Sequence, residues 1–470
     1  MARERTNQNF LDLFFEPNTV AVIGSLKGGL FGGSVVIRSL LHAGYSGQIF
    51  PVNPSYREAV GFKVYPSIQA VPETIDLAFV ITAARSVPGI LKECVAKRVR
   101  AAIVVSDGFA ERDEEGKRLQ EEIVAIAQNG GIRILGPNTA GVANPSKGFI
   151  PNPYAMGYEK VKPGAIAIGA QTGMINPQAF PYGDLHYGVS KICDFGNKAD
   201  VDECDLMEYL EGDPDTRVVS LYIEGIRDGR RFLRASRRLA SKKPVLVLKS
   251  GRTTQGAAVS ASHTGSLAVD DRIFDGACAQ AGVIRINTFR ELFELPKIFA
   301  FQPLPRGNRL GIVTFTGGVG VLAIDEGTPY GLTIPLLSSE TRRRLNEIFP
   351  GMGRRIVDVG PAMAVFDDYM PIYSKILKTV MADSSIDSVF NVLWTGPSGE
   401  FLEEYVRIYR ELPGIPKPVA TWVYGPRTAP VQELTRELED LGFPVFPEME
   451  MAIKSLALAW QYAKRKGGKG

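Results

Sequence analysis

The segment TVAVIGSLKGGLFGGSVVIRSLLHAG, residues 19–44, places an apolar run, a glycine-rich turn and a helical pattern in direct succession. Such a run is typical of a buried parallel strand, and the glycines let the chain turn sharply into a helix. The same succession begins again at AIAIGAQTG, residues 165–173, and at RLGIVTFTGGVG, residues 309–320. Strands that alternate with helices predict βαβ units and parallel sheets.

Further apolar runs follow each of these three starts. They are QIFPVN, DLAFVI, AAIVVS and IRIL in the first segment, GVSKICDFG, RVVSLYI, PVLVLKS and VIRI in the second, and LTIPLL, DSVFNVLW, PVATWV and FPVF in the third. We therefore predict three α/β domains, 1–147, 148–303 and 304–470, each built on a doubly wound parallel sheet. The predicted linkers are the stretches ANPSKGFIPNPYAMG and FQPLPRGN.

The composition is that of a soluble globular protein. Of 470 residues, 45% are hydrophobic and 22% are charged, and this length suits about three domains. The net charge of +3 is too small and too dispersed to predict binding to nucleic acid or to a membrane. No apolar run reaches the roughly 18 residues of a membrane span, and no signal-peptide pattern is present. The four cysteines lack CxxC spacing, so we expect neither a metal site nor disulfides, and a cytoplasmic location.

The first glycine turn, GSLKGGLFGG, suits a phosphate-bearing ligand, because backbone N–H groups at a helix start bind phosphate. An NAD site also needs an acidic residue at the end of the second strand, where this chain has Asn53 and Pro54. Coenzyme A, which carries several phosphates, is therefore favoured over NAD. The predicted CoA-binding residues lie at strand ends and in the turns that follow them: Gly24, Ser25, Lys27, Asn53, Arg57, Thr82, Ser106, Gly108 and Asn138. For Lys27 and Arg57 the alternative is a solvated surface charge.

One of only three histidines, His263, lies in SASHTGSLA, residues 260–268, which we predict to be a loop. It either caps a helix that starts near Ser266 or acts as a nucleophile whose small neighbours let a bulky group approach. A neutral imidazole is nucleophilic near pH 7 when an acceptor holds its other nitrogen. Glu224, which ends a predicted strand of the same domain, is the candidate acceptor, and the alternative is a surface glutamate.

Two further turns are candidate phosphate sites, because hydroxyl and backbone N–H groups at helix N-termini bind anions. The turn AQTGM offers Gln171, Thr172 and Gly173, and TGGVG offers Gly317 and Gly318. The pattern GxxxxGK[ST] does not occur, so no P-loop nucleotide site is predicted.

The segments that carry a family resemblance are LFFEPNTVAVIGS, GQIFPVNP, GIRILGPNTAG, FGNKADVDECDLMEYL, LYIEGIRDGRRFL, PVLVLKSGRT, SASHTGSLA and QAGVIRI. The chain resembles the α subunits of ADP-forming acetyl-CoA synthetases, and more loosely so in its last domain, with VTFTGGVGVLA. These belong to the NDP-forming acyl-CoA synthetases, which include succinyl-CoA synthetase. The resemblance implies a Rossmann-like CoA-binding domain followed by two flavodoxin-like domains. It also implies that phosphate displaces CoA from a thioester, that the acyl phosphate phosphorylates His263 beside Glu224, and that the phosphoryl group passes to ADP.

The resemblance further implies a partner, because no stretch is left over for the ATP-grasp module that binds the nucleotide. We expect a separate ATP-grasp β subunit that carries ATP or ADP with Mg²⁺, in an α2β2 assembly. The small-molecule partners would be CoA, phosphate and a small carboxylic acid. Gly251, Gly256 and Gly265 suit a His263 segment that travels between two sites.

Several positions depart from the family pattern. The turn is QTG instead of QSG, TAG replaces Cys-Leu-Gly, Phe315 replaces an asparagine, RRIVDVG replaces NPVDV, and ITAARS lacks a proline. These changes leave acetate, a larger aliphatic acid and an aryl acid open as substrates. The competing hypotheses are a CoA-binding regulatory or scaffold protein without turnover and, less favoured because of Asn53, a nicotinamide oxidoreductase.

Overall fold

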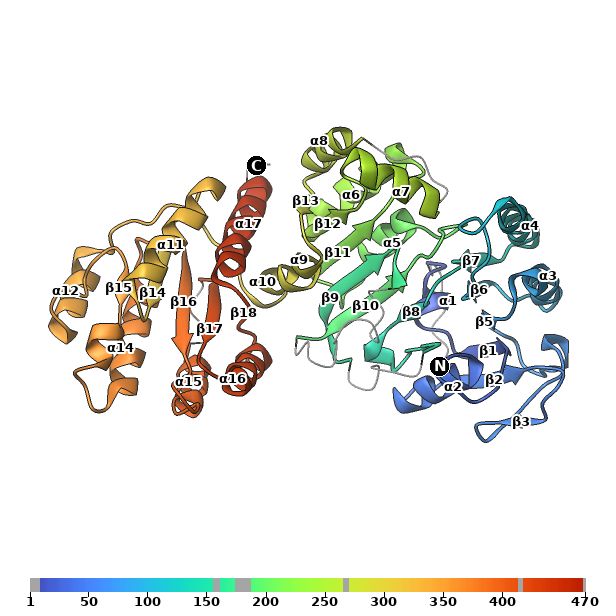
Figure 1. The fold of residues 1–470 in the computed structure, drawn as a ribbon, viewed down its shortest axis with the longest axis horizontal. Helices are drawn as coiled ribbons and strands as arrows, with labels where there is room; N and C mark the ends of the chain where they lie inside the picture. Colours follow the sequence, from blue (N-terminus) through green and yellow to red (C-terminus); the bar gives the residue numbers. More distant parts are fainter. Residues whose placement is uncertain (1–8, 155–160, 174–186, 265–269, 413–416, 468–470) are drawn as a thin grey trace, which may run out of the picture. The chain divides into compact units, whose positions relative to one another are not determined.

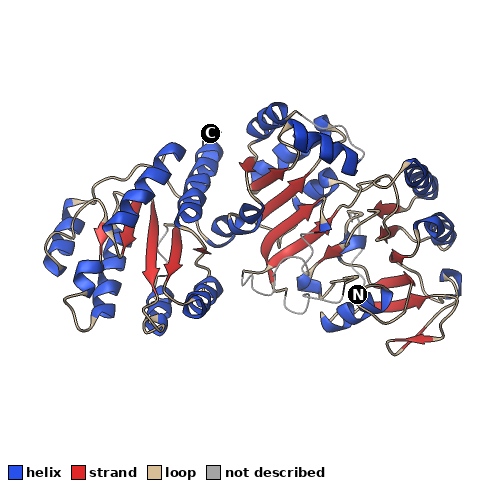
Figure 2. Ribbon diagram, in the orientation of Figure 1, coloured by secondary structure: helices blue, strands red, loops and turns tan. Residues whose placement is uncertain are grey.

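The computed structural model describes residues 9–154, 161–173, 187–264, 270–412 and 417–467, with side chains except at 260–264. The chain forms two compact units, residues 1–292 and 293–470 (Figure 1). Helices and strands alternate along both units (Figure 2). Each unit is described by itself below.

The first sheet of unit 1 is entirely parallel and has the order β2-β1-β5-β6-β7. Its strands are β1 (Thr19–Gly24), β2 (Gln48–Val52), β5 (Leu77–Ile81), β6 (Ala101–Val104) and β7 (Arg133–Leu135), and a short hairpin, β3 (Glu58–Ala59) and β4 (Phe62–Lys63), follows β2. Helix α2 (Gly33–His42) covers one face, and α3 (Val87–Ala96) and α4 (Glu114–Gly130) cover the other. The Asp113 carboxylate caps α4 by accepting the Gly116 N–H at 2.8 Å, and Gly131 ends it in the left-handed region.

The second sheet of unit 1 has the order β13-β12-β11-β9-β10-β8, and only the edge strand β8 is antiparallel. Its strands are β8 (Val142–Ala143), β9 (Pro163–Ala170), β10 (Val189–Asp194), β11 (Val218–Ile223), β12 (Val245–Lys249) and β13 (Ile284–Ile286). Its helices are α5 (Glu203–Leu210), α6 (Gly229–Lys242), α7 (Thr254–Thr264), α8 (Asp271–Ala281) and α9 (Phe289–Glu294). The helix expected at 174–183 lies outside the described residues.

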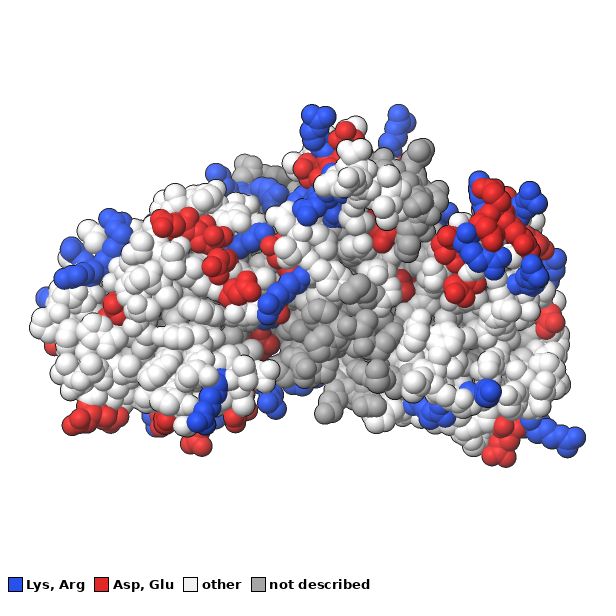
Figure 3. Space-filling view, viewed as in Figure 1, with Lys and Arg blue, Asp and Glu red and all other residues white. Residues whose placement is uncertain are grey.

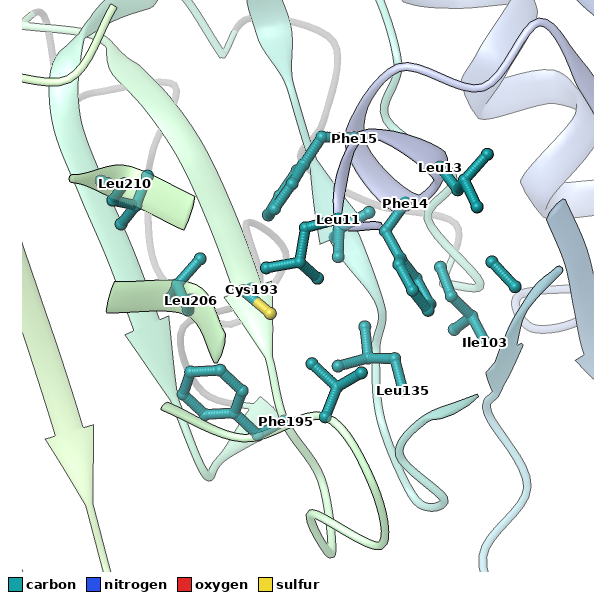
Figure 4. Packing of buried hydrophobic residues seen from close by; sticks show 14 of the residues in the cluster. Leu11, Leu13, Phe14, Phe15, Ile103, Leu135, Cys193, Phe195, Leu206 and Leu210 are labelled. Carbon is teal, nitrogen blue, oxygen red and sulfur yellow. The ribbon is translucent and has the colours of Figure 1, made fainter. Parts of the chain in front are cut away.

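The two sheets of unit 1 share one apolar core. The short helix α1 (Asp12–Phe15) inserts Phe14 and Phe15 between them, with Ile103 of the first sheet on one side and Cys193 of the second on the other (Figure 4). Both phenylalanine side chains are fully buried. Because burying an aromatic side chain contributes about 1.5–3 kcal/mol, this helix binds the two sheets into one unit.

Unit 2 carries a third parallel sheet with the order β15-β14-β16-β17-β18. Its strands are β14 (Leu310–Thr314), β15 (Val357–Asp358), β16 (Ser388–Trp394), β17 (Val419–Tyr424) and β18 (Val445–Phe446). Its helices are α10 (Pro296–Phe301), α11 (Gly317–Gly327), α12 (Ser339–Ile348), α13 (Gly360–Met363), α14 (Tyr369–Ala382), α15 (Leu402–Arg410), α16 (Thr428–Asp440) and α17 (Met449–Gly467). Helices α11 and α17 pack together, whereas α12, α14, α15 and α16 share the core on the opposite face (Figure 1).

One predicted strand is wrong. The run LTIPLL, residues 332–337, forms no strand and pairs with the sheet only through an isolated bridge between Thr333 and Arg309, and β15 takes the expected place beside β14. Pro335, in the middle of the run, has no N–H to donate to a neighbouring strand.

Apart from the antiparallel edge strand β8, all three sheets run outward from their first strand to their second and then cross back to the third, which confirms the doubly wound class. The switch points lie between β1 and β5, between β9 and β11, and between β14 and β16. In such sheets, ligands bind outside the carboxyl ends of the strands at the switch point. The strand order therefore directs attention to the residues that follow these six strands.

The described residues show mixed surface charge and no candidate membrane span or metal site. Acidic and basic side chains intermingle over α3 and α4 (Figure 3). Arg85, in the turn before α3, pairs with Glu115, and Lys92 pairs with Glu122. None of the described helices is long and apolar enough to cross a membrane. Within the same residues, no group of three His, Cys, Asp or Glu side chains is placed to hold a metal ion.

Candidate active site

Four predicted CoA-site residues are tied together at the carboxyl edge of the first sheet. The Asn53 side-chain amide donates to the Gly24 carbonyl at 2.7 Å, which joins the ends of β2 and β1. The Ser106 hydroxyl donates to the Thr82 carbonyl at 2.6 Å, which joins the ends of β6 and β5. The sequence placed these residues at one edge, and the structure brings them into two bonded pairs.

Gly24 ends β1 opposite Ile81 of β5, at the switch point of the first sheet. Its φ is +136°, and an added Cβ would lie 1.8 Å from the Ile81 carbonyl oxygen, so only glycine fits. The N–H of Ser25 donates to the same carbonyl at 3.3 Å. Lys27, in the turn after β1, and Arg57, after β2, are both exposed, as a contact to a soluble phosphate ligand requires.

Asn138 connects the first sheet with the second. Its N–H donates to the Ser106 carbonyl at 2.8 Å, and its side-chain amide donates to the Asn197 side-chain oxygen at 3.4 Å. Gly108, also in the predicted CoA set, lies in the neighbouring loop, where its N–H donates to the Glu111 carboxylate at 2.6 Å. The carboxyl edge of the first sheet, which carries the predicted CoA residues (the CoA edge), therefore continues into the carboxyl edge of the second sheet, which carries the predicted phosphate residues (the phosphate edge), within unit 1.

Gln171 organises the switch point of the second sheet. Its side-chain oxygen, just beyond β9, accepts the backbone N–H groups of Glu224 at 2.8 Å and Gly225 at 3.1 Å. The Tyr222 hydroxyl donates to the Glu224 carboxylate at 3.1 Å. Burial raises the pKa of Tyr222 to about 12, so this phenol stays a donor at neutral pH. Glu224 is thus held on both its main chain and its side chain.

A cavity of about 220 Å³ opens where these edges meet. Its described lining residues come from the ends of β6, β7, β9 and β10 and the loops that follow: Val105, Asn138, Thr139, Ala140, Tyr154, Gln171, Thr172, Gly173, Asp194, Gly196 and Asn197. The cavity joins the predicted CoA residue Asn138 to the predicted phosphate residues Gln171, Thr172 and Gly173. Its size suits a small acyl or phosphate group.

Sequence reasoning missed Asp194, the last residue of β10 and a wall of this cavity. Its carboxylate accepts the Ala140 N–H at 2.7 Å and the Gly196 N–H at 3.0 Å. Burial raises the pKa of Asp194 to about 6, and the nearby charge of Glu224 adds to the shift. Its position at a strand end, as for Glu224, was the available signal.

Lys198, in FGNKADVDE, was also missed. Its ammonium donates to the Gly225 carbonyl at 2.6 Å and to the Glu203 carboxylate at 2.8 Å, and both charged side chains are almost fully buried. The buried ion pair therefore fixes the loop that carries Glu224. A second, larger cleft of about 650 Å³ lies on the other side of Gln171 and Asn197, between α4 and this turn.

The backbone around His263 differs from the expectation. Residues Thr254–Thr264 form helix α7, so His263 lies in a helical turn, and the predicted loop is wrong up to this point. The His263 side chain, Gly265 and the expected helix start at Ser266 lie outside what the structure describes. The next described helix, α8, begins at Asp271 after its cap, Asp270.

Gly317 and Gly318 begin α11 in unit 2. An added Cβ at Gly317 would lie 3.4 Å from the Asp358 carboxylate, so this helix start already faces an acidic side chain of the chain itself. Phe315, which replaces the family's asparagine, is buried and stacks on Tyr373 with ring centroids 5.9 Å apart. The departure at Phe315 is thus a packing change, and phosphate binding at the two glycines stays a prediction.

Comparison with known families matches the order of the two sheets in unit 1. Residues 18–145 match the family described as CoA binding domain, and residues 163–299 match the succinyl-CoA ligase like flavodoxin domain. The fold and these matches define a ligase-type protein with a CoA-binding sheet ahead of a flavodoxin-like sheet.

Relatives that match nearly the whole of this chain define the family more closely. The chain is 35% identical to the acetate–CoA ligase (ADP-forming) I subunit alpha of Pyrococcus furiosus, over 97% of this chain and 98% of that protein. It is also 35% identical to the acetate–CoA ligase (ADP-forming) II of Archaeoglobus fulgidus, over 97% of this chain and 67% of that protein. The chain belongs to the family of ADP-forming acetate–CoA ligases, which confirms the resemblance found in the sequence.

A solved structure agrees. The dinucleotide-forming acetyl-coenzyme A synthetase 1 of Ca. Korarchaeum cryptofilum, in complex with phosphate and ADP, shares 28% identity and a TM-score of 0.87. The match covers 98% of each chain.

Proposed function

We propose that this chain is the α subunit of an NDP-forming acyl-CoA synthetase. It interconverts acyl-CoA, phosphate and ADP with a carboxylic acid, CoA and ATP, through an acyl phosphate and a phosphohistidine at His263. The observation that carries the proposal is the 220 Å³ cavity, where Asn138 of the CoA edge meets Thr172 and Gly173 of the phosphate edge. An enzyme that joins phosphate to a thioester carbonyl needs these two edges in contact.

Residues in different parts of the site take different roles in this reaction. The glycine turn after β1 leaves backbone open to a phosphate-bearing ligand, with nothing within 4 Å of an added Cβ at Gly28 or Gly29, which fits CoA. CoA supplies the thiol of the thioester. Thr172 and Gly173 hold phosphate, and Glu224, braced by Tyr222, orients the imidazole of His263 when it takes the phosphoryl group.

The division of the chain supports a partner. We assign CoA binding to residues 1–147, the phosphohistidine segment to 148–303 and a second flavodoxin-like ligase domain to 304–470. The nucleotide and Mg²⁺ then belong to an ATP-grasp β subunit in an α2β2 assembly. In support, the Pyrococcus relative, which this chain matches over 98% of its length, is named a subunit alpha, whereas the Archaeoglobus relative is matched over only 67% of its length.

The test compares the purified chain with the chain plus its co-purifying partner, each with ATP, Mg²⁺, CoA and a panel of carboxylic acids that includes acetate. We expect thioester formation only with the partner present, because the nucleotide site lies there. Thioester formation by the chain alone would contradict the assignment of the nucleotide to a partner. CoA binding without turnover in the assembled complex would favour a scaffold instead.

A further inference from the structure

The 220 Å³ cavity has an unusual charge for a site that receives an anion. Asp194 is the only charged side chain among its described lining residues, and the others offer amides, hydroxyls and backbone groups. A fully ionised oxyanion would be repelled by this carboxylate. Among the described lining residues, a phosphate would therefore meet one carboxylate acceptor and no cationic side chain, and this arrangement calls for a physical explanation.

Asp194 is built into the wall of this cavity. Its side chain is buried, and each carboxylate oxygen accepts one backbone N–H, from Ala140 at 2.7 Å and from Gly196 at 3.0 Å. A carboxylate offers about four acceptor positions, so with these two N–H groups and the neighbouring Thr139 hydroxyl it keeps capacity for one further donor. These bonds fix the direction of the carboxylate without filling all of its acceptor positions.

Inorganic phosphate supplies the missing donor. Near neutral pH it carries at least one P–OH group, whereas sulfate carries none, so a carboxylate acceptor favours phosphate over sulfate. Thr172 and Gly173 line the same cavity, and a threonine hydroxyl and a backbone N–H are groups that bind phosphate oxygens.

We propose that Asp194 accepts a hydrogen bond from the P–OH group of inorganic phosphate and takes that proton when the phosphate attacks the acyl thioester. This inference rests on the proposed function and adds a catalytic residue to it. As the proton leaves, a phosphate oxygen forms a C–O bond to the thioester carbonyl carbon, and the C–S bond breaks. The products are an acyl phosphate and the CoA thiolate, and the proton on Asp194 passes to the thiolate, so one proton moves from phosphate to sulfur.

The acidity of Asp194 fits this relay. Burial raises its pKa to about 6, between that of an ordinary carboxyl and that of a thiol. The titratable groups around it are Glu224 beyond β11, whose charge adds to the shift, Tyr154 across the cavity and its chain neighbour Cys193. The carboxylate is therefore ionised above about pH 6 and protonated below it.

The test measures CoA release from acyl-CoA and phosphate by the full chain with its partner, using an acyl-CoA that the wild type turns over. In Asp194→Asn we expect the rate to fall by about 100-fold or more, as for loss of a general base. We also expect the wild type to bind phosphate at least about tenfold more tightly than sulfate, measured as phosphate KM against sulfate Ki. This preference should vanish in the variant, because an amide donates to an unprotonated oxyanion. Asp383→Asn, at a buried carboxylate of unit 2 with backbone N–H donors from Ser338 and Ser385, is the matched control and should keep wild-type rate and selectivity.

The pH profile separates catalysis from a structural role. Because phosphate titrates in the same range, the readout is the ratio of wild-type to variant rate, which should fall as the pH drops below about 6. If Asp194→Asn does not fold, the wild-type preference for phosphate over sulfate should itself weaken below that pH. If the wild type is active but the phosphate preference does not change and the rate ratio does not fall at low pH, the inference about Asp194 is overturned and the proposed function still stands. A wild-type complex that releases no CoA from any acyl-CoA overturns the proposed function as well.

Discussion

Asp194 ends β10 and Glu224 directly follows β11, the two strands on either side of β9, and their surroundings differ. Asp194 is buried and accepts two backbone N–H groups, whereas the Glu224 carboxylate accepts the Tyr222 hydroxyl. Two carboxylates in one site, held in different environments, suit different tasks. In our account Asp194 handles the proton of phosphate, and Glu224 orients His263.

Replacing Glu224 with Gln tests the second of these tasks. Gln171 bonds the backbone N–H of residue 224, so the loop should keep its shape in the variant. The neutral amide no longer stabilises the charge that develops on the imidazole, and we expect phosphorylation of His263 from ATP in the assembled complex to slow by about 100-fold or more. Quench-flow labelling measures the rate, and thermal unfolding checks the fold. An unchanged rate with an unchanged melting temperature would remove Glu224 from the mechanism.

At the scale of elements, the turn between β10 and α5 holds the loop after β11. Lys198 adopts a left-handed backbone conformation with φ 54°, which directs its ammonium to the Gly225 carbonyl and the Glu203 carboxylate. Through Lys198, the motif FGNKADVDE thus holds the loop that carries Glu224. Lys198 itself does not line the 220 Å³ cavity.

Replacing Lys198 with Met should weaken both stability and activity. Loss of the ammonium leaves the Glu203 charge buried without its partner, which costs about 3–5 kcal/mol of unfolding free energy. It also frees the Gly225 carbonyl, so His263 phosphorylation should slow. Lys191→Met is the control, because the Lys191 ammonium is equally buried in β10 but lies 3.5 Å from Asp213 and Asp215, ahead of β11. Chemical denaturation and the labelling rate are the measurements, and a rate loss of the same size in both variants would mean that Lys198 is merely structural.

Most of the strands were predicted from the sequence, because a run of apolar residues is typical of a strand that is buried on both faces. The prediction failed at β15, where two residues, Val357 and Asp358, are too few to form a pattern. It also read the small residues before His263 as a loop, although alanine is a good helix former and short side chains permit helix. The strand-end position of Asp194 was visible in the sequence, but the hydrogen bond from Ala140, 54 residues away, was not.

At the scale of the molecule, the same strand order occurs three times, and two of the three switch edges meet within unit 1. The shared core around Phe14 and Phe15 holds the two sheets, and with them these two edges, together. The cavity between the edges therefore depends on the packing of the whole unit. Thioester and phosphate chemistry are thereby assigned to unit 1. His263, on α7 of the same unit, is assigned the transfer of the phosphoryl group to the partner.

The most direct measurement starts from the thioester side with no nucleotide present. The assembled complex is incubated with radiolabelled inorganic phosphate and an acyl-CoA that it turns over, and the label is mapped by peptide analysis. The account predicts an acid-labile, alkali-stable label on His263, absent from His263→Asn, that moves to ATP when ADP and Mg²⁺ are added. A label that persists in His263→Asn, or ATP formation by that variant, would contradict it.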